Sequence, residues 1–231
     1  MDDAAHPPPL SRGWPADADA LVRAQVELAA ARSDPWRPAG ELRVAGCFAC
    51  FPRGATGRGA AGDPAWAAAA LGEVTAVVTG AAGAAYEPGL LALREGPLLE
   101  AAVRALGAAP DVLLADATGR DHPRRAGLAL HLGAVLDLPT VGVTHRPLLA
   151  AGEWPGREPG ASSPLVFDGE VVGAWLRVRR GARPLAVHAA WRTDADTAVA
   201  IVLAACGRVR TPAPLRRARH AARSARARAG G

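Results

Sequence analysis

Lysine is absent from this 231-residue sequence, aromatic residues make up only 4% of it, and cysteine occurs three times. Three cysteines are too few for a disulfide framework. Cys47 and Cys50 form a CxxC pair, but they lie in a segment that reads as extended, where side chains three residues apart point to opposite faces, so we expect no zinc site. No apolar run approaches the roughly 18 residues of a membrane span, and the first twenty residues lack a hydrophobic signal segment. We therefore expect a cytoplasmic monomer without membrane contact.

The basic charge is uneven along the chain. All 27 basic residues are arginines, against 22 acidic residues, for a formal net charge of +5. Together with the high Ala, Gly and Pro content, this usage is typical of GC-rich coding. Residues 208–231 contain eight arginines and no acid, which leaves the other 207 residues at −3. We expect this tail to be flexible, either simply solvated or adding salt-dependent phosphate contacts.

Half of the residues are hydrophobic, enough for one sizeable core. We expect a disordered lead over residues 1–18 and one domain over 19–207. Apolar periodicity predicts the following elements: a helix over 19–32 capped by Asp19, an antiparallel meander of 42–51, 65–71 and 74–79, a helix beginning near Glu95, a strand over 112–116, a helix around 128–135, a strand over 140–144, a hairpin of 171–178 and 184–190, and a helix from Asp194 to Gly207. This order predicts an α/β fold, with a mixed sheet flanked by helices, compatible with a ribonuclease H-like architecture.

Two carboxylates are candidates for chemistry. Glu95 heads the apolar stripe of its helix and should face the sheet, while Asp116 ends a strand predicted to be buried on both faces. The carboxyl edge of an open α/β sheet is where such folds bind ligands, and paired carboxylates there are typical of nuclease magnesium sites. The alternative is ordinary: Asp116 caps a turn and Glu95 complements the helix dipole.

Two further segments have weaker signals. Tyr86 lies in a turn with Pro88 and Gly89, where it could stack on a nucleic-acid base or be an ordinary exposed tyrosine. The segment His122-Pro-Arg124-Arg125 could bind a phosphate or be a solvated loop.

Taken together, the order and spacing of these segments resemble the endonuclease V family over about residues 20–205. The matching segments are Arg23-Ala-Gln25, Tyr86-Glu-Pro-Gly-Leu-Leu91, Arg94-Glu-Gly-Pro-Leu-Leu99, Pro110-Asp111 through Asp116, His122-Pro-Arg-Arg125 with Gly127-Leu128-Ala129, and Pro139-Thr-Val-Gly-Val143. The resemblance implies a ribonuclease H-like fold and a DNA-repair nuclease. It also implies magnesium, with manganese as the alternative, as the cofactor for cutting nucleic acid 3′ to deoxyinosine or inosine.

The resemblance further implies roles for individual residues. Glu95 and Asp116 correspond to catalytic, metal-binding acids. The turn from Tyr86 through Pro88 to Gly89 corresponds to a strand-separating wedge, whose aromatic ring fills the gap left by an extruded base. The remaining implied nucleic-acid contacts are Leu91, Gly127 and Leu128 in the base pocket, Gly119 and His122 in the loop beside the metal, and Arg124 with Arg125.

Four positions depart from the family pattern: Phe48, Ala117, His145 and Trp191. Phe48 stands where the family has a metal-binding aspartate, and its ring offers no lone pair to a hard cation. Ala117 replaces a glycine, His145 a lysine, and Trp191 a histidine near the metal; His188 should face away from that position.

Three hypotheses remain open. The chain is an endonuclease V-type hydrolase, weakened or inactive, unless Asp63 or Glu73 rebuilds the metal site. Alternatively, it is a catalytically dead homologue that still binds nucleic acid. In the third case, its fold serves a protein partner. Loss of a metal ligand commonly removes several kcal/mol of transition-state stabilisation, and about 1.4 kcal/mol is a tenfold change in rate, which favours weakened activity.

Overall fold

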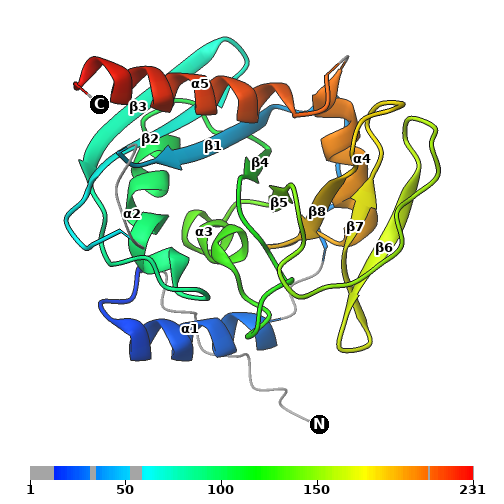
Figure 1. Ribbon diagram of the computed structural model, residues 1–231, viewed down its shortest axis with the longest axis horizontal. Coiled ribbons are helices and arrows are strands. Elements are labelled where there is room, and N and C mark those ends of the chain that lie inside the picture. Colours follow the sequence, from blue (N-terminus) through cyan, green and yellow to red (C-terminus); the bar gives the residue numbers. More distant parts are fainter. Residues whose placement is uncertain (1–12, 32–34, 53–58, 208, 231) are drawn as a thin grey trace, which may run out of the picture.

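The computed structural model describes residues 13–31, 35–52, 59–207 and 209–230. Its strands form one eight-stranded sheet, and helices cover both faces of this sheet (Figure 1). In chain order they are α1 (Ala18–Ala30), β1 (Val44–Cys50), β2 (Pro64–Leu71), β3 (Val74–Ala81), α2 (Leu91–Arg104), β4 (Val112–Ala115), α3 (Leu128–Leu136), β5 (Thr140–Thr144), β6 (Ser162–Phe167), β7 (Glu170–Leu176), β8 (Leu185–Ala189), α4 (Ala195–Cys206) and α5 (Ala213–Arg228).

The sheet has the order β3-β2-β1-β4-β5-β8-β7-β6, and it is mixed. β1, β4 and β5 run parallel at its centre, while β1, β2 and β3 form the antiparallel meander that the sequence predicts. Helices α1, α2 and α3 pack on one face and α4 and α5 on the other, because alternate residues of the central strands contribute to separate hydrophobic clusters. The predicted α/β class with a helix-flanked mixed sheet is confirmed.

The arginine-rich tail differs from the expectation. Most of it forms α5, which crosses β1 and β2 along the upper edge of Figure 1. Leu215, Ala218, Ala222 and Ala225 form the buried stripe of this helix, and the arginines project from its other faces. Gly46 of β1 permits the close approach, since a Cβ there would lie 2.6 Å from the backbone nitrogen of Leu215. The prediction of a flexible tail was wrong for these residues because an alanine stripe is a weak hydrophobic signal until a sheet surface faces it.

Smaller corrections concern a cap, a strand and the lead. Asp17, not Asp19, caps α1 by accepting a hydrogen bond from the Ala20 amide. Strand β6 is not among the predicted elements, and it pairs with β7 in an antiparallel hairpin. Residues 1–12 of the predicted disordered lead lie outside the described residues, whereas Trp14 stacks on His131 with ring centroids 4.8 Å apart. Within the described ranges, no helix combines the length and apolar character needed to cross a membrane.

Candidate functional site

A cavity of about 220 Å³ opens at the carboxyl edge of β4 and β5. Eight of the residues singled out in the sequence line it: Tyr86, Pro88, Gly89, Leu91, Asp116, Ala117, His122 and Leu128. The other lining residues are Gln25, Glu87, Ala92, Thr118, Thr144 and Leu148. We call this cavity the base pocket. Gln25 and Glu87 lie in matched family segments and were within reach of sequence reasoning, but the other four were not singled out.

The turn that carries Tyr86 is held from below at the carbonyl of Gly89. This oxygen accepts hydrogen bonds from Gln25 Nε2 at 3.1 Å and Arg124 Nη2 at 2.9 Å, and it lies 3.2 Å from His122 Nε2. Gly89 has a φ of +81°, a left-handed conformation that favours glycine. Tyr86 above it is 43% exposed. The turn is therefore rigid at its base and presents its one aromatic ring to solvent.

His122 is buried in its neutral form. The Arg124 amide donates to Nδ1 at 3.2 Å, so the ring proton belongs on Nε2, where it points to the Gly89 carbonyl. Burial, with the charge of Arg124, lowers the pKa of His122 to about 4. The side chain therefore acts at neutral pH as a positioned hydrogen-bond donor, not as a cation.

Gly119 and Gly127 lie behind the base pocket and do not line it. A Cβ on Gly119 would lie 2.1 Å from the Ala189 carbonyl oxygen, and one on Gly127 would lie 2.4 Å from the Thr118 carbonyl oxygen. Both glycines allow backbone segments to pack closely. They support the pocket wall; Gly127 does not line the base pocket as the resemblance implied, and the place of Gly119 beside a metal stays a prediction.

The guanidinium groups of Arg124 and Arg125 are occupied within the protein. Arg124 donates to Gln25 Oε1 at 2.6 Å and to the Gly89 carbonyl. Arg125 donates to the Phe167 carbonyl, lies over the Phe167 ring and is 3.6 Å from the Asp168 carboxylate. The structure does not place either in the base-pocket lining. Their positions explain the local architecture, while direct phosphate contact by them stays a prediction.

Glu95 and Asp116 are electrostatically close, as the sequence predicts. Glu95 is half-buried on α2; burial raises its pKa to about 7, opposed by the charge of Arg94 and assisted by that of Asp116. Both carboxylates, together with burial, raise the pKa of the Cys47 thiol on β1. The charges of both acids therefore act on the middle of β1, and Glu95 can change its protonation state near neutral pH.

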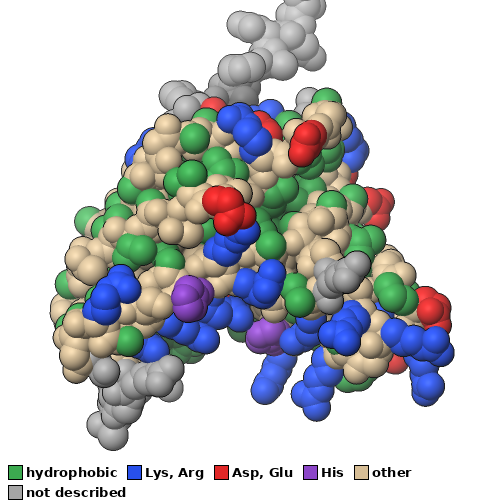
Figure 2. Space-filling view, turned by 90° about the horizontal axis from the view of Figure 1, so that it is seen from above, with side chains coloured by type: hydrophobic (Ala, Val, Ile, Leu, Met, Phe, Trp, Pro, Cys, Tyr) green, Lys and Arg blue, Asp and Glu red, His purple; other side chains and the backbone are tan. Residues whose placement is uncertain are grey.

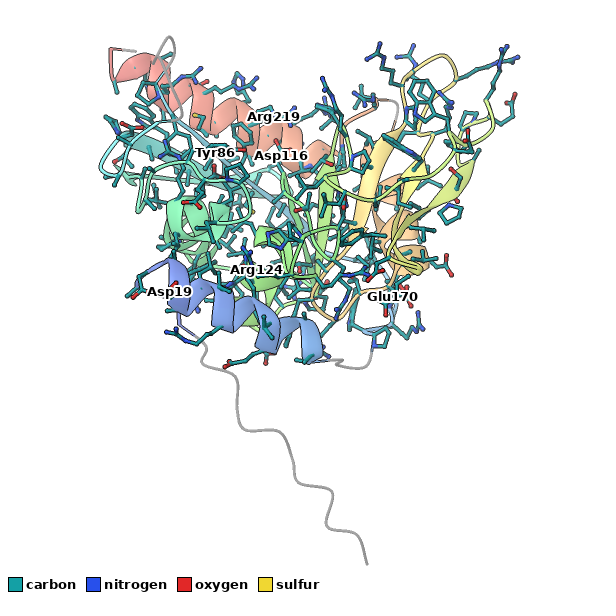
Figure 3. All side chains as sticks on the ribbon, turned by 60° about the horizontal axis from the view of Figure 1, so that its bottom comes forward. Asp19, Tyr86, Asp116, Arg124, Glu170 and Arg219 are labelled. Atoms are coloured by element: carbon teal, nitrogen blue, oxygen red, sulfur yellow. The ribbon has the colours of Figure 1, made fainter. Side chains whose placement is uncertain are left out.

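Phe48 stands at the position of the expected third acid, and two arginine side chains lie over its ring. Phe48 points to the α5 side of β1, where the guanidinium carbons of Arg219 and Arg223 lie 5.2 and 5.4 Å from its ring centroid. Arg219 Nη2 donates to Asp116 Oδ2 at 2.8 Å. Figure 3 shows Asp116 and Arg219 close together, with Tyr86 nearby. A fixed monovalent cation thus already neutralises the carboxylate that the family resemblance assigns to a metal.

Neither Asp63 nor Glu73 completes a set of metal-binding carboxylates with Asp116 and Glu95. Asp63 pairs with Arg94 at 3.0 Å and accepts from the Ala60 amide, while Glu73 pairs with Arg217 of α5. Among the residues that the structure describes, no three His, Cys, Asp or Glu side chains are grouped as metal ligands. The donor set around Asp116 therefore does not fit a magnesium ion, which takes oxygen ligands in near-octahedral geometry.

The remaining substituted positions have separate surroundings. His145 is exposed, and slight burial with the charges of Arg210 and Arg219 lowers its pKa, while Asp116 opposes the shift. Trp191 is buried in the core on the α3 side. His188 is fully buried in β8 with Nε2 2.8 Å from Thr144 Oγ1, and it does not line the base pocket.

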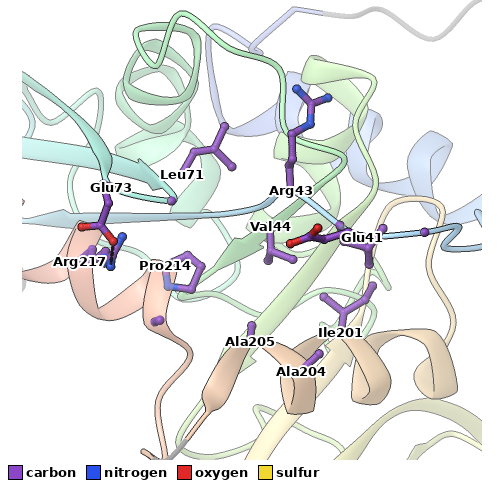
Figure 4. A pocket seen from close by; sticks show the side chains of 14 residues that line it. Glu41, Arg43, Val44, Leu71, Glu73, Ile201, Ala204, Ala205, Pro214 and Arg217 are labelled. Atoms are coloured by element: carbon purple, nitrogen blue, oxygen red, sulfur yellow. Dashed lines mark hydrogen bonds and ion pairs between the residues drawn. The ribbon is translucent and has the colours of Figure 1, made fainter.

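A larger cavity of about 700 Å³ lies elsewhere, between the start of β1, the β2–β3 turn, α4 and α5 (Figure 4). Small and apolar groups such as Val44, Ala204 and Pro214 line much of it. Three of its charged residues have partners: Arg217 and Glu73 pair with each other, and Arg43 pairs with Asp111 at 3.0 Å. Its size alone does not indicate chemistry, so the base pocket is the better candidate.

Comparisons with known proteins identify one family. A family model described as Endonuclease V matches residues 44–220. Endonuclease V of Streptomyces avermitilis is 37% identical over 213 residues, covering 90% of this chain and 92% of the relative. A crystal structure of endonuclease V from the same organism has a TM-score of 0.83 at 35% identity, covering 96% of this chain and 98% of that chain. Endonuclease V of Rhodospirillum centenum is 40% identical over 227 residues, 95% of this chain and 93% of the relative.

The fold also matches that of a Ciona intestinalis endonuclease V solved in complex with a 24mer DNA containing an inosine followed by a ribo-adenosine. That likeness has a TM-score of 0.75 at 20% identity, over 90% of this chain and 97% of that chain. With a family model spanning most of the sheet and relatives aligned along nearly the full length, the chain belongs to the endonuclease V family of nucleases.

Proposed function

We propose that this protein recognises deoxyinosine or inosine in nucleic acid and that it hydrolyses the phosphodiester bond weakly or not at all. One observation supports the proposal: most residues that the family resemblance assigns to base recognition gather around one cavity, whereas Arg219 binds Asp116 and Phe48 stands at the position of a metal ligand. Recognition and hydrolysis depend on different residues, so one function can persist without the other.

The base pocket suits a single flat base. Its volume of about 220 Å³ accommodates a purine, and Leu91 and Leu128 contribute apolar lining. Ala117 and Thr118 add backbone groups at the end of β4 that can face the edge of a base. The exposed Tyr86 ring would occupy the gap that the extruded base leaves in the stack. An inosine-containing DNA is the ligand of the Ciona protein that shares this fold.

Hydrolysis requires groups that this site lacks. Phosphodiester cleavage in metal-dependent nucleases needs a cation that stabilises the developing charge and activates water. The Arg219 guanidinium can attract a phosphate, but it cannot be deprotonated in proteins and does not coordinate a water. Burial raises the pKa of Glu95 to about 7, so it is available to accept a proton, but a general base alone does not stabilise the charge that develops on the phosphate. We therefore expect binding to exceed catalysis.

The test is a paired measurement on labelled duplexes with and without one deoxyinosine, in Mg²⁺ and in Mn²⁺. Binding is measured by gel shift, and cleavage on a denaturing gel. We expect inosine-dependent binding with little or no cutting. Tyr86→Ala should weaken the preference for inosine, whereas Tyr86→Phe retains the ring and should preserve it. Cutting by the wild type that Asp116→Ala abolishes would refute the loss of hydrolysis. Equal binding to both duplexes would refute inosine recognition.

A further inference from the structure

A third cavity, of about 430 Å³, lies between two loops near the edge of the sheet opposite the meander. One loop follows β5 and carries Trp154 and Arg157, and the other connects β7 to β8 and carries Arg180 and Arg183. We call this the Trp154 pocket. Four arginines line it and no acidic residue does. Such a lining is matched to an anion.

Arg177 fixes the two loops to each other. Its guanidinium is 9% exposed and donates to the carbonyls of Pro155 and Gly156 on one loop and of Ala182 on the other. The guanidinium carbon lies 5.9 Å from the Trp154 ring centroid. Arg177 therefore forms the floor of the Trp154 pocket, and its guanidinium N–H groups hold the two loops together.

The other three arginines are available to a ligand. Arg157, Arg180 and Arg183 are exposed, and no carboxylate among the described residues pairs with them. Arg210, whose guanidinium binds the Arg183 and Pro184 carbonyls, has its pKa lowered by burial and by the charge of Arg183. The region therefore holds uncompensated positive charge. Figure 2, which looks onto the α5 side, shows basic side chains gathered along one side of this face.

Trp154 adds a specific requirement. Its side chain is 57% exposed although it is the largest apolar group in the pocket, and it contacts Trp175 edge-on at 6.4 Å between centroids, which leaves ring surface open. An exposed indole beside unpaired guanidinium groups is the combination that binds single-stranded nucleic acid, because bases stack on the ring while arginines hold phosphates. We infer that the Trp154 pocket is a second nucleotide subsite, which takes a single-stranded residue of the same nucleic acid. This rests on the proposed function only in that the ligand is a nucleic acid.

The chain connects this subsite to the base pocket. Leu148 lines the base pocket, and Trp154 follows six residues later, so their Cα atoms lie at most about 20 Å apart. At about 3.4 Å per nucleotide, a nucleic-acid strand covers this distance in at most about six nucleotides. Asp121 anchors the start of the connecting segment by accepting the amides of Leu148, Leu149 and Ala150 at 2.6 to 2.8 Å. One strand can therefore reach both pockets.

The experiment measures fluorescence anisotropy of labelled single strands of 5 and 15 nucleotides, each with inosine or adenosine at the centre, over a salt series. Trp154→Leu should weaken binding of the 15-mers at least about fivefold, and Trp154→Phe should restore most of it. Arg180→Gln and Arg183→Gln should each lower the salt slope by about 0.7. Arg179→Gln is the matched control, because Arg179 is exposed and adjacent but does not line the pocket. The 5-mers, whose outer nucleotides lie only two positions from the central base, should lose less binding than the 15-mers in every variant.

The preference for inosine over adenosine should stay constant in these variants, because it belongs to the base pocket. If the wild type shows no such preference, the proposed function fails, while a loss of 15-mer binding in Trp154→Leu would still support the subsite. Unchanged 15-mer binding in Trp154→Leu, or an equal loss in Arg179→Gln and Arg180→Gln, would overturn it. So would inorganic polyphosphate binding wild type and Trp154→Leu as tightly as the 15-mer, since that result indicates an anion site without base stacking.

Discussion

Replacing Phe48 by aspartate and removing the Arg219 guanidinium from the acidic site should make the protein respond to a divalent cation. Arg219 now neutralises Asp116 at 2.8 Å and lies over Phe48. The double variant Phe48→Asp/Arg219→Ala removes this cation and offers three carboxylates, counting Glu95. If the new site binds Mg²⁺ with a Kd on the order of 1 mM, then 10 mM Mg²⁺ stabilises the fold by about 1.4 kcal/mol. For a chain of this size, Tm should rise by about 3–6 °C.

Arg219→Ala alone has a separate cost. The two side chains of the ion pair are 21% and 26% exposed, so the loss should fall between that of a surface pair and that of a buried one, about 1–2 kcal/mol. Arg223→Ala is the control, because Arg223 lies over the same ring and has no carboxylate partner among the described residues. We expect that variant to lose less than about 1 kcal/mol.

The assay is thermal unfolding with and without 10 mM Mg²⁺ or Mn²⁺. The wild type should show no metal-dependent change, and Asp116→Ala added to the double variant should abolish the response. A rise in wild-type Tm comparable to that of the double variant would show that Arg219 does not replace the metal. A natively folded double variant that ignores both metals would also refute the reasoning.

Three further predictions concern the supports of the base pocket. The pKa of His122 in the fold, about 4, lies below its unfolded value of about 6.5, so its neutral ring stabilises the fold fully above pH 6.5. This contribution to the free energy of unfolding falls by up to about 3 kcal/mol as the pH drops toward 4. Urea titrations of His122→Gln should show a flatter decline with falling pH, and an unchanged decline would count against His122 as its cause. Asp121→Asn leaves at least one of three amides facing an NH₂ group and should cost about 2–3 kcal/mol in calorimetry; a Tm within about 1 °C of wild type would contradict that. Gly89→Ala puts a side chain at a φ of +81°, with its Cβ 3.2 Å from Arg124 Nη2, and should weaken inosine binding in the gel shift. Gly62→Ala is the control, because Gly62 has a similar φ but open space around it, and it should bind inosine as the wild type does. An equal loss of binding in both variants would indicate that backbone strain in general is the cause.

Local patterns were sufficient for much of the fold. The meander, the α2 stripe headed by Glu95 and the Asp194 cap of α4 depend on side-chain periodicity and on residues three positions apart. The meander, the stripe and the cap were predictable since the interactions that produce them act within a few residues. The residues around the base pocket come from segments far apart in the chain, and they were named in advance through the resemblance to endonuclease V, since their local patterns alone left the site open.

What only the tertiary structure decided involves partners far apart in the chain. The Arg219–Asp116 pair joins residues 103 positions apart, and it exists because an alanine stripe docks α5 across Gly46. The same applies to Arg124, whose charge suggested phosphate but whose guanidinium binds Gln25, 99 positions away. A side chain's charge is written in the sequence, but whether that charge meets a ligand or a carboxylate depends on which surface packing brings beside it.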